Sequence, residues 1–231
     1  MTRHGLSAAG VADAGAFLGR LHRLDPAALV RLRPASLAAP TLVQGPASGV
    51  ALWARLPWGA LVTRTVDGAV AVDATVAAGD LLAVLSAGGD ALPARQDPSW
   101  RWPLPPAPVM AVESVPAATV RALGAAAERT LRTGAGRAVG ERAIRDALLD
   151  HVPIMVEPTE AQCGAGPVPG RVAVPQRLVQ AVVRMGFLGR SDLPVRVLVA
   201  GRSASRFVGL AAEYGTAWYQ KPIGLSINTL G

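Results

Sequence analysis

The chain of 231 residues has one cysteine, Cys163, and one lysine, Lys221. A lone cysteine excludes an intramolecular disulfide and is typical of a cytoplasmic protein. The sequence also lacks a continuous apolar stretch long enough for a signal-peptide core or a membrane span. Because 51% of the residues are apolar, the chain has enough material for a sizeable core. We therefore expect a soluble, folded, cytoplasmic protein with no membrane span.

Residue groups that support catalysis are equally scarce. The three histidines, His4, His22 and His151, occupy a terminal segment, a helix border and a helix end, and none has a partner at a metal-ligand spacing. Cys163 could act as a nucleophile only with a base such as His151 beside it, and the sequence carries no signature for that pair. We predict no catalytic residue, no metal and no cofactor. An enzyme that uses carboxylates from distant segments stays an alternative.

Positive charge dominates the ionisable residues. Arginine and lysine together number 23 against 16 acidic residues, which gives a formal net charge of +7. Arginine in place of lysine reflects GC-rich codon usage, but the same usage supplies Asp and Glu and does not explain the excess. A basic balance favours polyanionic partners such as nucleic acid, acidic proteins or anionic membrane surfaces. No run of five like charges occurs, so the sequence has no basic tail.

Apolar periodicity predicts an α+β fold with one mixed, mainly antiparallel sheet system. The expected helices cover residues 7–24, 75–85, 116–132, 138–150 and 174–188. The expected strands cover residues 28–34, 50–66 as a hairpin, 153–158, 194–201, 206–212, 216–222 and 224–228. We divide the chain into an N-terminal α-β half (1–92), a proline-rich connection (93–108), a central helical pair (109–152) and a C-terminal α-β half (153–231).

The two halves echo each other in sequence. "FLGR" ends an apolar helix at 17–20 and again at 187–190, and each copy is followed by an aspartate, a strand containing Val-Arg and an aromatic-glycine turn. The offsets between matching features fall steadily along the chain, as expected if the second copy has shorter loops. This order predicts a pseudo-twofold α-β-β-β duplication. Because a biased composition also produces one tetrapeptide match by chance, the duplication is a hypothesis.

The stretch "ALWARLPWGALVTR" (51–64) has the chemistry of a hairpin. Proline and glycine in "LPWGA" fit a type I turn followed by a left-handed residue and a bulge. This turn pairs Leu52 with Arg64 on a mostly apolar face and places Trp53 beside Arg55 on the other face. We expect "AEYGT" to form the same turn in the second copy. That turn pairs residues 211 with 217, 209 with 219 and 207 with 221.

A face that combines an aromatic ring with a basic residue can stack on nucleic-acid bases or anchor a protein. The loop "GRSASR" (201–206) adds donors suited to phosphate. The candidate nucleic-acid-binding residues are Trp53, Arg55, Arg64, Arg202, Arg206, Tyr219 and Lys221. The simpler interpretation is that Trp53 is buried beneath a helix or the segment "SWRWPLPP". The sequence does not decide what covers this face: another part of this chain, another chain or a nucleic acid.

The favoured function is therefore a non-catalytic binding protein that acts on nucleic acid. The alternatives are an adaptor or chaperone that captures an acidic protein on the same face, and a small-molecule enzyme with its site between the halves. A homodimer built on a sheet edge is a further expectation. In "ALWARLPWGALVTR" and "VPQRLVQAVVRMGFLG" the chain resembles a group of actinobacterial proteins with no assigned activity. That resemblance implies a cytoplasmic single-chain protein and assigns no site residue.

Overall fold

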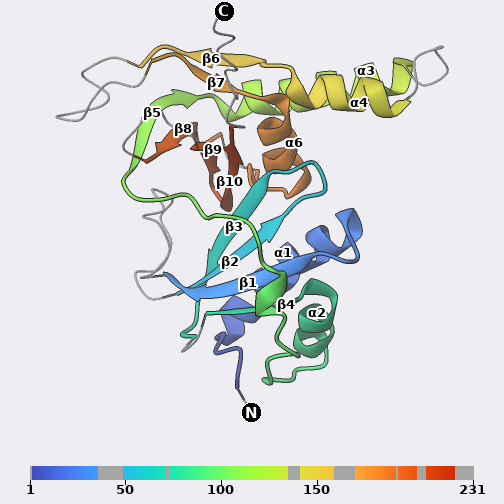
Figure 1. Ribbon diagram of the computed structural model, residues 1–231, viewed down its shortest axis with the longest axis vertical. Helices are drawn as coiled ribbons and strands as arrows, with labels where there is room; N and C mark the ends of the chain where they lie inside the picture. Colours follow the sequence, from blue (N-terminus) through green and yellow to red (C-terminus); the bar gives the residue numbers. More distant parts are fainter. Residues whose placement is uncertain are drawn as a thin grey trace, which may run out of the picture.

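A computed structural model describes residues 2–35, 49–70, 73–134, 141–158, 170–190, 192–201 and 207–221. Eight strands form one antiparallel sheet in the order β4-β1-β2-β3-β10-β9-β8-β5, and two more form a separate ribbon (Figure 1). The strands are β1 Leu29–Pro34, β2 Val50–Arg55, β3 Leu61–Val66, β4 Ala74–Ala77, β5 Val109–Val115, β6 Ile154–Val156, β7 Val172–Val174, β8 Val195–Ala200, β9 Phe207–Ala212 and β10 Gly215–Gln220. The helices are α1 Ala8–Leu24, α2 Ala78–Ser86, α3 Ala117–Gly134, α4 Glu141–Asp150, α6 Gln176–Arg184 and a short 3-10 turn, Asp97–Ser99.

The predicted α+β class and the α-β-β-β duplication are both confirmed by the order of these elements. Helix α1 precedes β1, β2 and β3 in the first half, and α6 precedes β8, β9 and β10 in the second. The halves meet where β3 pairs with β10 at the centre of the sheet. Each half then adds one strand at its outer edge, β4 beside β1 and β5 beside β8. One continuous sheet therefore joins the two copies.

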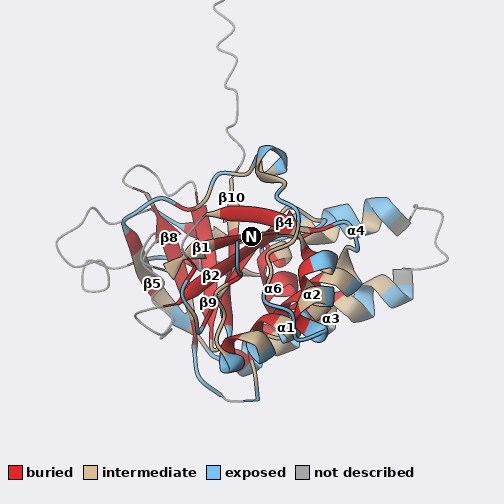
Figure 2. Ribbon diagram, turned by 90° about the horizontal axis from the view of Figure 1, so that it is seen from below, coloured by how far each residue is buried: buried red, intermediate tan, exposed pale blue. Residues whose placement is uncertain are grey.

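The repeated "FLGR" segments contact each other across this junction. The rings of Phe17 and Phe187 lie 6.4 Å apart between centroids with an interplanar angle of 6°. Both rings are 1% exposed and belong to the core between the helices and the sheet. Helices α1 and α6 lie on the sheet, α2 packs beside α1, and α3 and α4 pack against α6. Figure 2 shows that the strands and α6 are largely buried, whereas α4 keeps an exposed face.

The first hairpin has the predicted register. Leu52 pairs with Arg64 and Trp53 with Thr63. The turn closes with a hydrogen bond from the Leu56 N–H to the Ala60 carbonyl (2.8 Å), and Gly59 has a φ of +86°. That left-handed backbone is the conformation that the proline-glycine pattern requires.

The predicted register of the second hairpin is wrong by one residue. Ala211 pairs with Thr216, and Ala212 pairs with Gly215 around a two-residue loop. Gly215 opens β10 and does not form a bulge. A Cβ at this position would lie 2.7 Å from the ring of Phe187 and 2.7 Å from the Thr63 carbonyl oxygen. Glycine is therefore needed here for close packing between the halves, and the sequence pattern did not distinguish this role from a turn.

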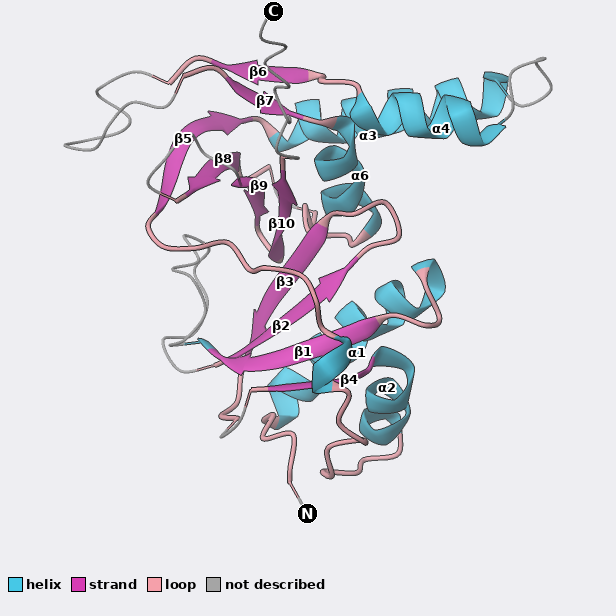
Figure 3. Cartoon of the chain, in the orientation of Figure 1, coloured by secondary structure: helices cyan, strands magenta, loops and turns pink. Residues whose placement is uncertain are grey.

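Other predicted elements differ in their limits. The helix expected from Thr75 begins at Ala78, because residues 74–77 form β4 and pair with β1 (Figure 3). Strand β5 was not predicted. It pairs with β8, with a register shift between Ala111 and Glu113. The predicted central helical pair is present as α3 and α4. The strand expected at 224–228 lies outside the described residues.

The second face of the sheet is covered by residues 95–104, "RQDPSWRWPL", which we call the strap. It crosses β1 and β2 on its way from α2 to β5 (Figure 1). Trp100, Trp102 and Leu104 pack against a second apolar cluster that contains Trp53 and Trp218. Two apolar layers therefore enclose the sheet, one made of helices and one made of the strap.

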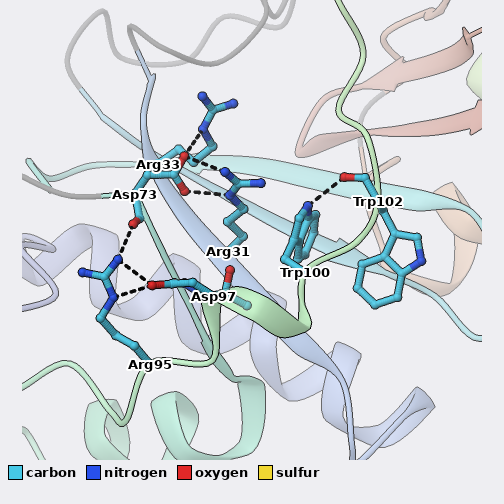
Figure 4. A network of polar contacts seen from close by, with 8 residues as sticks. Arg31, Arg33, Asp73, Arg95, Asp97, Trp100 and Trp102 are labelled. Atoms are coloured by element: carbon cyan, nitrogen blue, oxygen red, sulfur yellow. Dashed lines mark hydrogen bonds and ion pairs between the residues drawn. The ribbon is translucent and has the colours of Figure 1, made fainter.

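An arginine-aspartate network holds the strap beside the sheet (Figure 4). Asp73 accepts hydrogen bonds from Arg31 at 2.7 and 2.8 Å and pairs with Arg33 at 2.8 Å. The Asp73 carbonyl also accepts a hydrogen bond from Arg95 of the strap at 3.0 Å. Because a bidentate arginine contact fixes both partners in orientation, Asp73 joins two arginines of β1 to the start of the strap.

Asp97 provides a second attachment. Its carboxylate accepts the Thr75 N–H at 2.7 Å and the Arg95 Nε–H at 2.7 Å. The hydrogen bond from Thr75 lowers the pKa of Asp97 most, the pair with Arg95 lowers it further, and partial burial opposes both effects. The Arg31 guanidinium lies 5.7 Å from the ring centroid of Trp100, and the Trp100 Nε1–H donates to the Trp102 carbonyl at 2.8 Å. These contacts hold Trp100 and Trp102 in position on the sheet.

The Phe17–Phe187 contact generates a prediction about stability. Phe187→Ala removes a fully buried ring at the junction of the halves and should lower the free energy of unfolding by about 3–5 kcal/mol. Phe187→Leu keeps most of the apolar volume and should cost about 1.5 kcal/mol or less. Urea unfolding followed by circular dichroism measures both variants. A loss below about 1 kcal/mol for the alanine variant would show that this contact does not stabilise the junction.

The Asp97 attachment predicts a dependence on pH. A carboxylate whose folded-state pKa lies below its usual value stabilises the fold above that value, and this contribution is lost as the pH falls below about 4. Because the Asp97 side chain is 40% exposed, solvent screening limits the effect to about 1 kcal/mol. Asp97→Asn should flatten the fall in unfolding free energy between pH 5 and pH 2. Asp90→Asn, which removes a carboxylate outside the strap, is the control, and identical profiles for the two variants would contradict the assignment.

Candidate functional site

Trp53 does not lie on an open surface. Its side chain is 2% exposed and belongs to the apolar cluster beneath the strap. A ring that stacks on a base must be accessible, so the predicted stacking role of Trp53 is wrong. Of the three possibilities for what covers this face, the structure shows the first: another part of the same chain covers it. The simpler interpretation of the sequence, in which the segment "SWRWPLPP" buries Trp53, is therefore confirmed.

Arg64 lies on the opposite face of the sheet from Arg55. It donates a hydrogen bond to Asp13 of α1 at 2.6 Å, and its guanidinium lies 5.3 Å from the ring centroid of Tyr214. Its side chain is only 12% exposed. Arg64 therefore ties β3 to α1, and the expectation that it shares a site with Arg55 is wrong. Arg202 and Arg206 lie outside the described residues, and Lys221 follows β10 and is partly exposed.

Arg55 and Tyr219 are the two predicted site residues that the fold brings together. Both line a small pocket of about 190 Å³ at the end of the first hairpin. The Arg55 guanidinium lies 5.3 Å from the ring centroid of Trp102, and the Arg177 guanidinium lies 4.6 Å from that of Tyr219. Two cation-π pairs, one from each half of the chain, therefore meet at this pocket. Among the described residues, the lining consists of Arg55, Gly59, Leu61, Trp102, Pro103, Arg177, Tyr219 and Gln220.

A larger groove of about 1190 Å³ adjoins the pocket and shares Arg55, Gly59 and Arg177 with it. The groove runs between the β2–β3 turn, the end of α3, and helices α4 and α6. In the described part of the chain, its charged residues are five arginines and two aspartates: Arg55, Arg142, Arg145, Arg177, Arg184, Asp146 and Asp150. We call this feature the arginine-lined groove. Its lining carries a net positive charge.

Arg177 fixes the shape of the groove. One guanidinium nitrogen donates to the Trp58 carbonyl at 2.7 Å, and the Trp58 Nε1–H donates to the Arg177 carbonyl at 3.1 Å. A second nitrogen forms a close ion pair with Asp150 of α4. The side chain is 16% exposed. Arg177 therefore locks the first hairpin to the second half of the chain.

The remaining arginines of the groove are more accessible. The Arg142 side chain is 93% exposed and only loosely paired with Asp146, at 3.9 Å. The Arg184 side chain is 47% exposed and lies 3.6 Å from Glu128. The sequence analysis assigned no binding role to the charges of α4. The usable signal was the spacing of Arg142 and Arg145, which puts both on one side of the helix.

His4 lies in a buried part of the chain, with hydrogen bonds at both ring nitrogens. His4 is 4% exposed and not in an open tail. Its Nε2 bonds to the Gly89 carbonyl at 3.0 Å, and its Nδ1 accepts the Leu6 N–H at 3.1 Å. Among the described residues, no three of His, Cys, Asp and Glu are grouped to hold a metal, and Cys163 lies outside them. No helix in the described part of the chain is long and apolar enough to cross a membrane. The groove can hold anions through its guanidinium groups.

Solved structures with a similar arrangement are DNA polymerase III beta subunits. The chain superposes on one from Eubacterium rectale with a TM-score of 0.50 and 10% identity, over 93% of this chain and 63% of that one. Those from Pseudomonas aeruginosa and Streptococcus pyogenes give TM-scores of 0.48, with 13% and 10% identity, over 94% and 91% of this chain and 63% and 62% of theirs. The chain thus spans less than two thirds of each. No curated protein matches the sequence.

Two family models match the sequence, and they meet within the proline-rich connection. The first, described as domain of unknown function DUF8010, matches residues 3–102. The second, described as domain of unknown function DUF8185, matches residues 104–224, which is more than half of the chain. The chain therefore belongs to the family described as domain of unknown function DUF8185.

Proposed function

We propose that the protein is a non-catalytic nucleic-acid-binding protein that holds the phosphate backbone in the arginine-lined groove. The observation that carries this proposal is the convergence of five arginines from β2, α4 and α6 on one groove that contains two aspartates. Guanidinium groups present several donors in a planar fork that matches phosphate oxygens. The site differs from the one predicted at Trp53, but it retains Arg55.

The dimensions and charge of the groove favour a polymer over a small anion. A volume of about 1190 Å³ exceeds what a single small ligand needs. Phosphates of a nucleic-acid backbone repeat along a strand, so several arginines can be contacted at once and counterions are released. The net charge of +7 adds long-range attraction toward a polyanion.

The fold comparison is consistent with this proposal. The E. rectale protein, which resembles the chain with a TM-score of 0.50, is named as a subunit of a DNA polymerase. At 10% identity that likeness concerns the fold, so the argument for nucleic acid rests on the groove. Binding of a phosphate backbone needs fixed positive charge and no proton transfer, so the groove does not need an acid-base pair for this function.

The double variant Arg142→Ala/Arg145→Ala tests the proposal. Both residues line the groove, and their helix is exposed, so removing them should weaken binding without unfolding the chain. Fluorescence anisotropy with a labelled duplex, measured across a salt series, should show the log-log salt slope becoming shallower by about 2. Arg129→Ala/Arg132→Ala is the matched control, because it removes two exposed arginines at the same spacing that do not line the groove.

Two results would contradict the proposal. One is the absence of duplex or single-strand binding by the unmodified protein at low ionic strength. The other is an equal loss of affinity in the groove variant and in the control, which would assign binding to net charge alone.

A protein partner is the second candidate function, and the exposed side chains beside the β6–β7 ribbon favour it. Met155 is 54% exposed and Val152 is 38% exposed. Met side chains adapt to varied apolar surfaces and are common in interfaces. An apolar partner surface could therefore dock on this ribbon.

A pulldown from lysate with and without nuclease separates the two candidate functions. If the groove carries function, captured material should be lost on nuclease treatment and in Arg142→Ala/Arg145→Ala. If the ribbon carries function, one protein should persist after nuclease and be lost in Met155→Glu, because a buried unpaired charge opposes docking. A nuclease-resistant partner that is unaffected by Met155→Glu would argue against the ribbon.

A further inference from the structure

We infer that the small pocket beside the arginine-lined groove binds one unpaired base of a nucleic-acid strand, an assignment that rests on the proposed function. The pocket is lined by Trp102 of the strap and Tyr219 of β10, with Arg55 and Arg177 between the two halves of the chain. It would give the protein a preference for single strands or strand ends over continuous duplex. The four side chains come from separate elements, so the fold itself assembles the site.

The size of the pocket limits what can enter. Its volume of about 190 Å³ lies below the 300–1,000 Å³ typical of sites that enclose a whole small-molecule ligand. A flat ring fits this space, whereas a nucleotide with its sugar and phosphates does not. The remainder of the ligand must lie outside, and the arginine-lined groove is the adjoining space.

The lining chemistry matches a base. Aromatic side chains and guanidinium planes are the surfaces on which unstacked bases pack, and here each ring already has a guanidinium within 5.3 Å of its centroid. A paired base inside a duplex presents no free ring face to such a pocket. The pocket therefore selects for an unpaired base.

Gly59 brings the two arginines close together. A Cβ at this position would lie 3.4 Å from a terminal nitrogen of Arg55 and 3.5 Å from one of Arg177. The two guanidinium groups thus lie within about 7 Å of each other at one turn. Two like charges at this separation repel, and a phosphate or an electron-rich ring between them offsets the repulsion. Asp150 offsets only the Arg177 side.

The position of the pocket beside the groove also allows a base of a strand bound in the groove to enter it. Arg55, Gly59 and Arg177 line both spaces, so a strand whose phosphates follow the groove passes the mouth of the pocket. The pocket is preformed, because the strap holds Trp102 and the Trp58–Arg177 hydrogen bonds hold the turn. Little side-chain ordering is then required on binding.

The test compares single-strand and duplex affinity in variants of the pocket. Trp102→Leu and Tyr219→Leu remove a ring but keep apolar packing. Each should weaken binding of a labelled oligothymidylate by about tenfold, the usual value of one stacked base, and leave the affinity for a blunt duplex within about twofold. Tyr214→Leu is the matched control, because it removes an exposed aromatic ring that does not line the pocket.

The outcomes separate this inference from the proposed function. Loss confined to single strands in both pocket variants, but not in the control, supports the pocket. Equal loss for single strand and duplex, or no loss in Tyr219→Leu, overturns the pocket and leaves the groove in place. No binding of either oligonucleotide by the unmodified protein overturns both. If Trp102→Leu instead abolishes capture of a nuclease-resistant protein, the pocket takes a peptide side chain and the inference is wrong.

Discussion

The pairing of β3 with β10 is the contact on which the rest of the structure depends. Three residue pairs, from Leu61–Trp218 to Thr63–Thr216, join two four-stranded halves into one sheet. The close approach needs glycine at position 215, where a side chain would collide with Phe187 and with the backbone of β3. The groove lies between the turn of the first half and α4 and α6 of the second. Its shape therefore depends on this junction, together with the contacts of Arg177, for the relative position of the halves.

The strap determines which surface of the sheet is available. By covering the second face, it converts Trp53 and Trp218 from surface aromatics into core residues. It also divides the arginines into two groups. One group pairs with Asp73 and Asp97, which neutralise much of its charge and hold the strap; it consists of Arg31, Arg33 and Arg95. The groove brings five arginines together with two aspartates, and it includes the most exposed of the ion-paired arginines described here, Arg142. Charge excess is thus concentrated away from the strap.

Local patterns predicted the parts of this fold that depend on neighbours in the chain. The register of the first hairpin followed from Pro57, Gly59 and strand alternation, and "FLGR" marked the two helices that meet at Phe17 and Phe187. The predicted register of the second hairpin was wrong by one residue, because the sequence pattern could not show that Gly215 faces Phe187. The site was mostly missed for the same reason. Trp102, Arg142 and Arg177 reach it from segments whose proximity depends on tertiary packing.

The turn at Gly59 sets electrostatic stability against the binding role that we propose for this site. Placing Arg55 and Arg177 around one glycine costs electrostatic free energy, and their ring contacts and Asp150 offset only part of it. A chain under selection for stability alone would lose little by replacing Arg55 with an apolar residue, since Leu61 and Trp102 already line that wall. Local rules of stability are commonly broken where a ligand binds. The pair of cations at this turn therefore fits the proposal of an anion-bearing ligand at the place where the two halves meet.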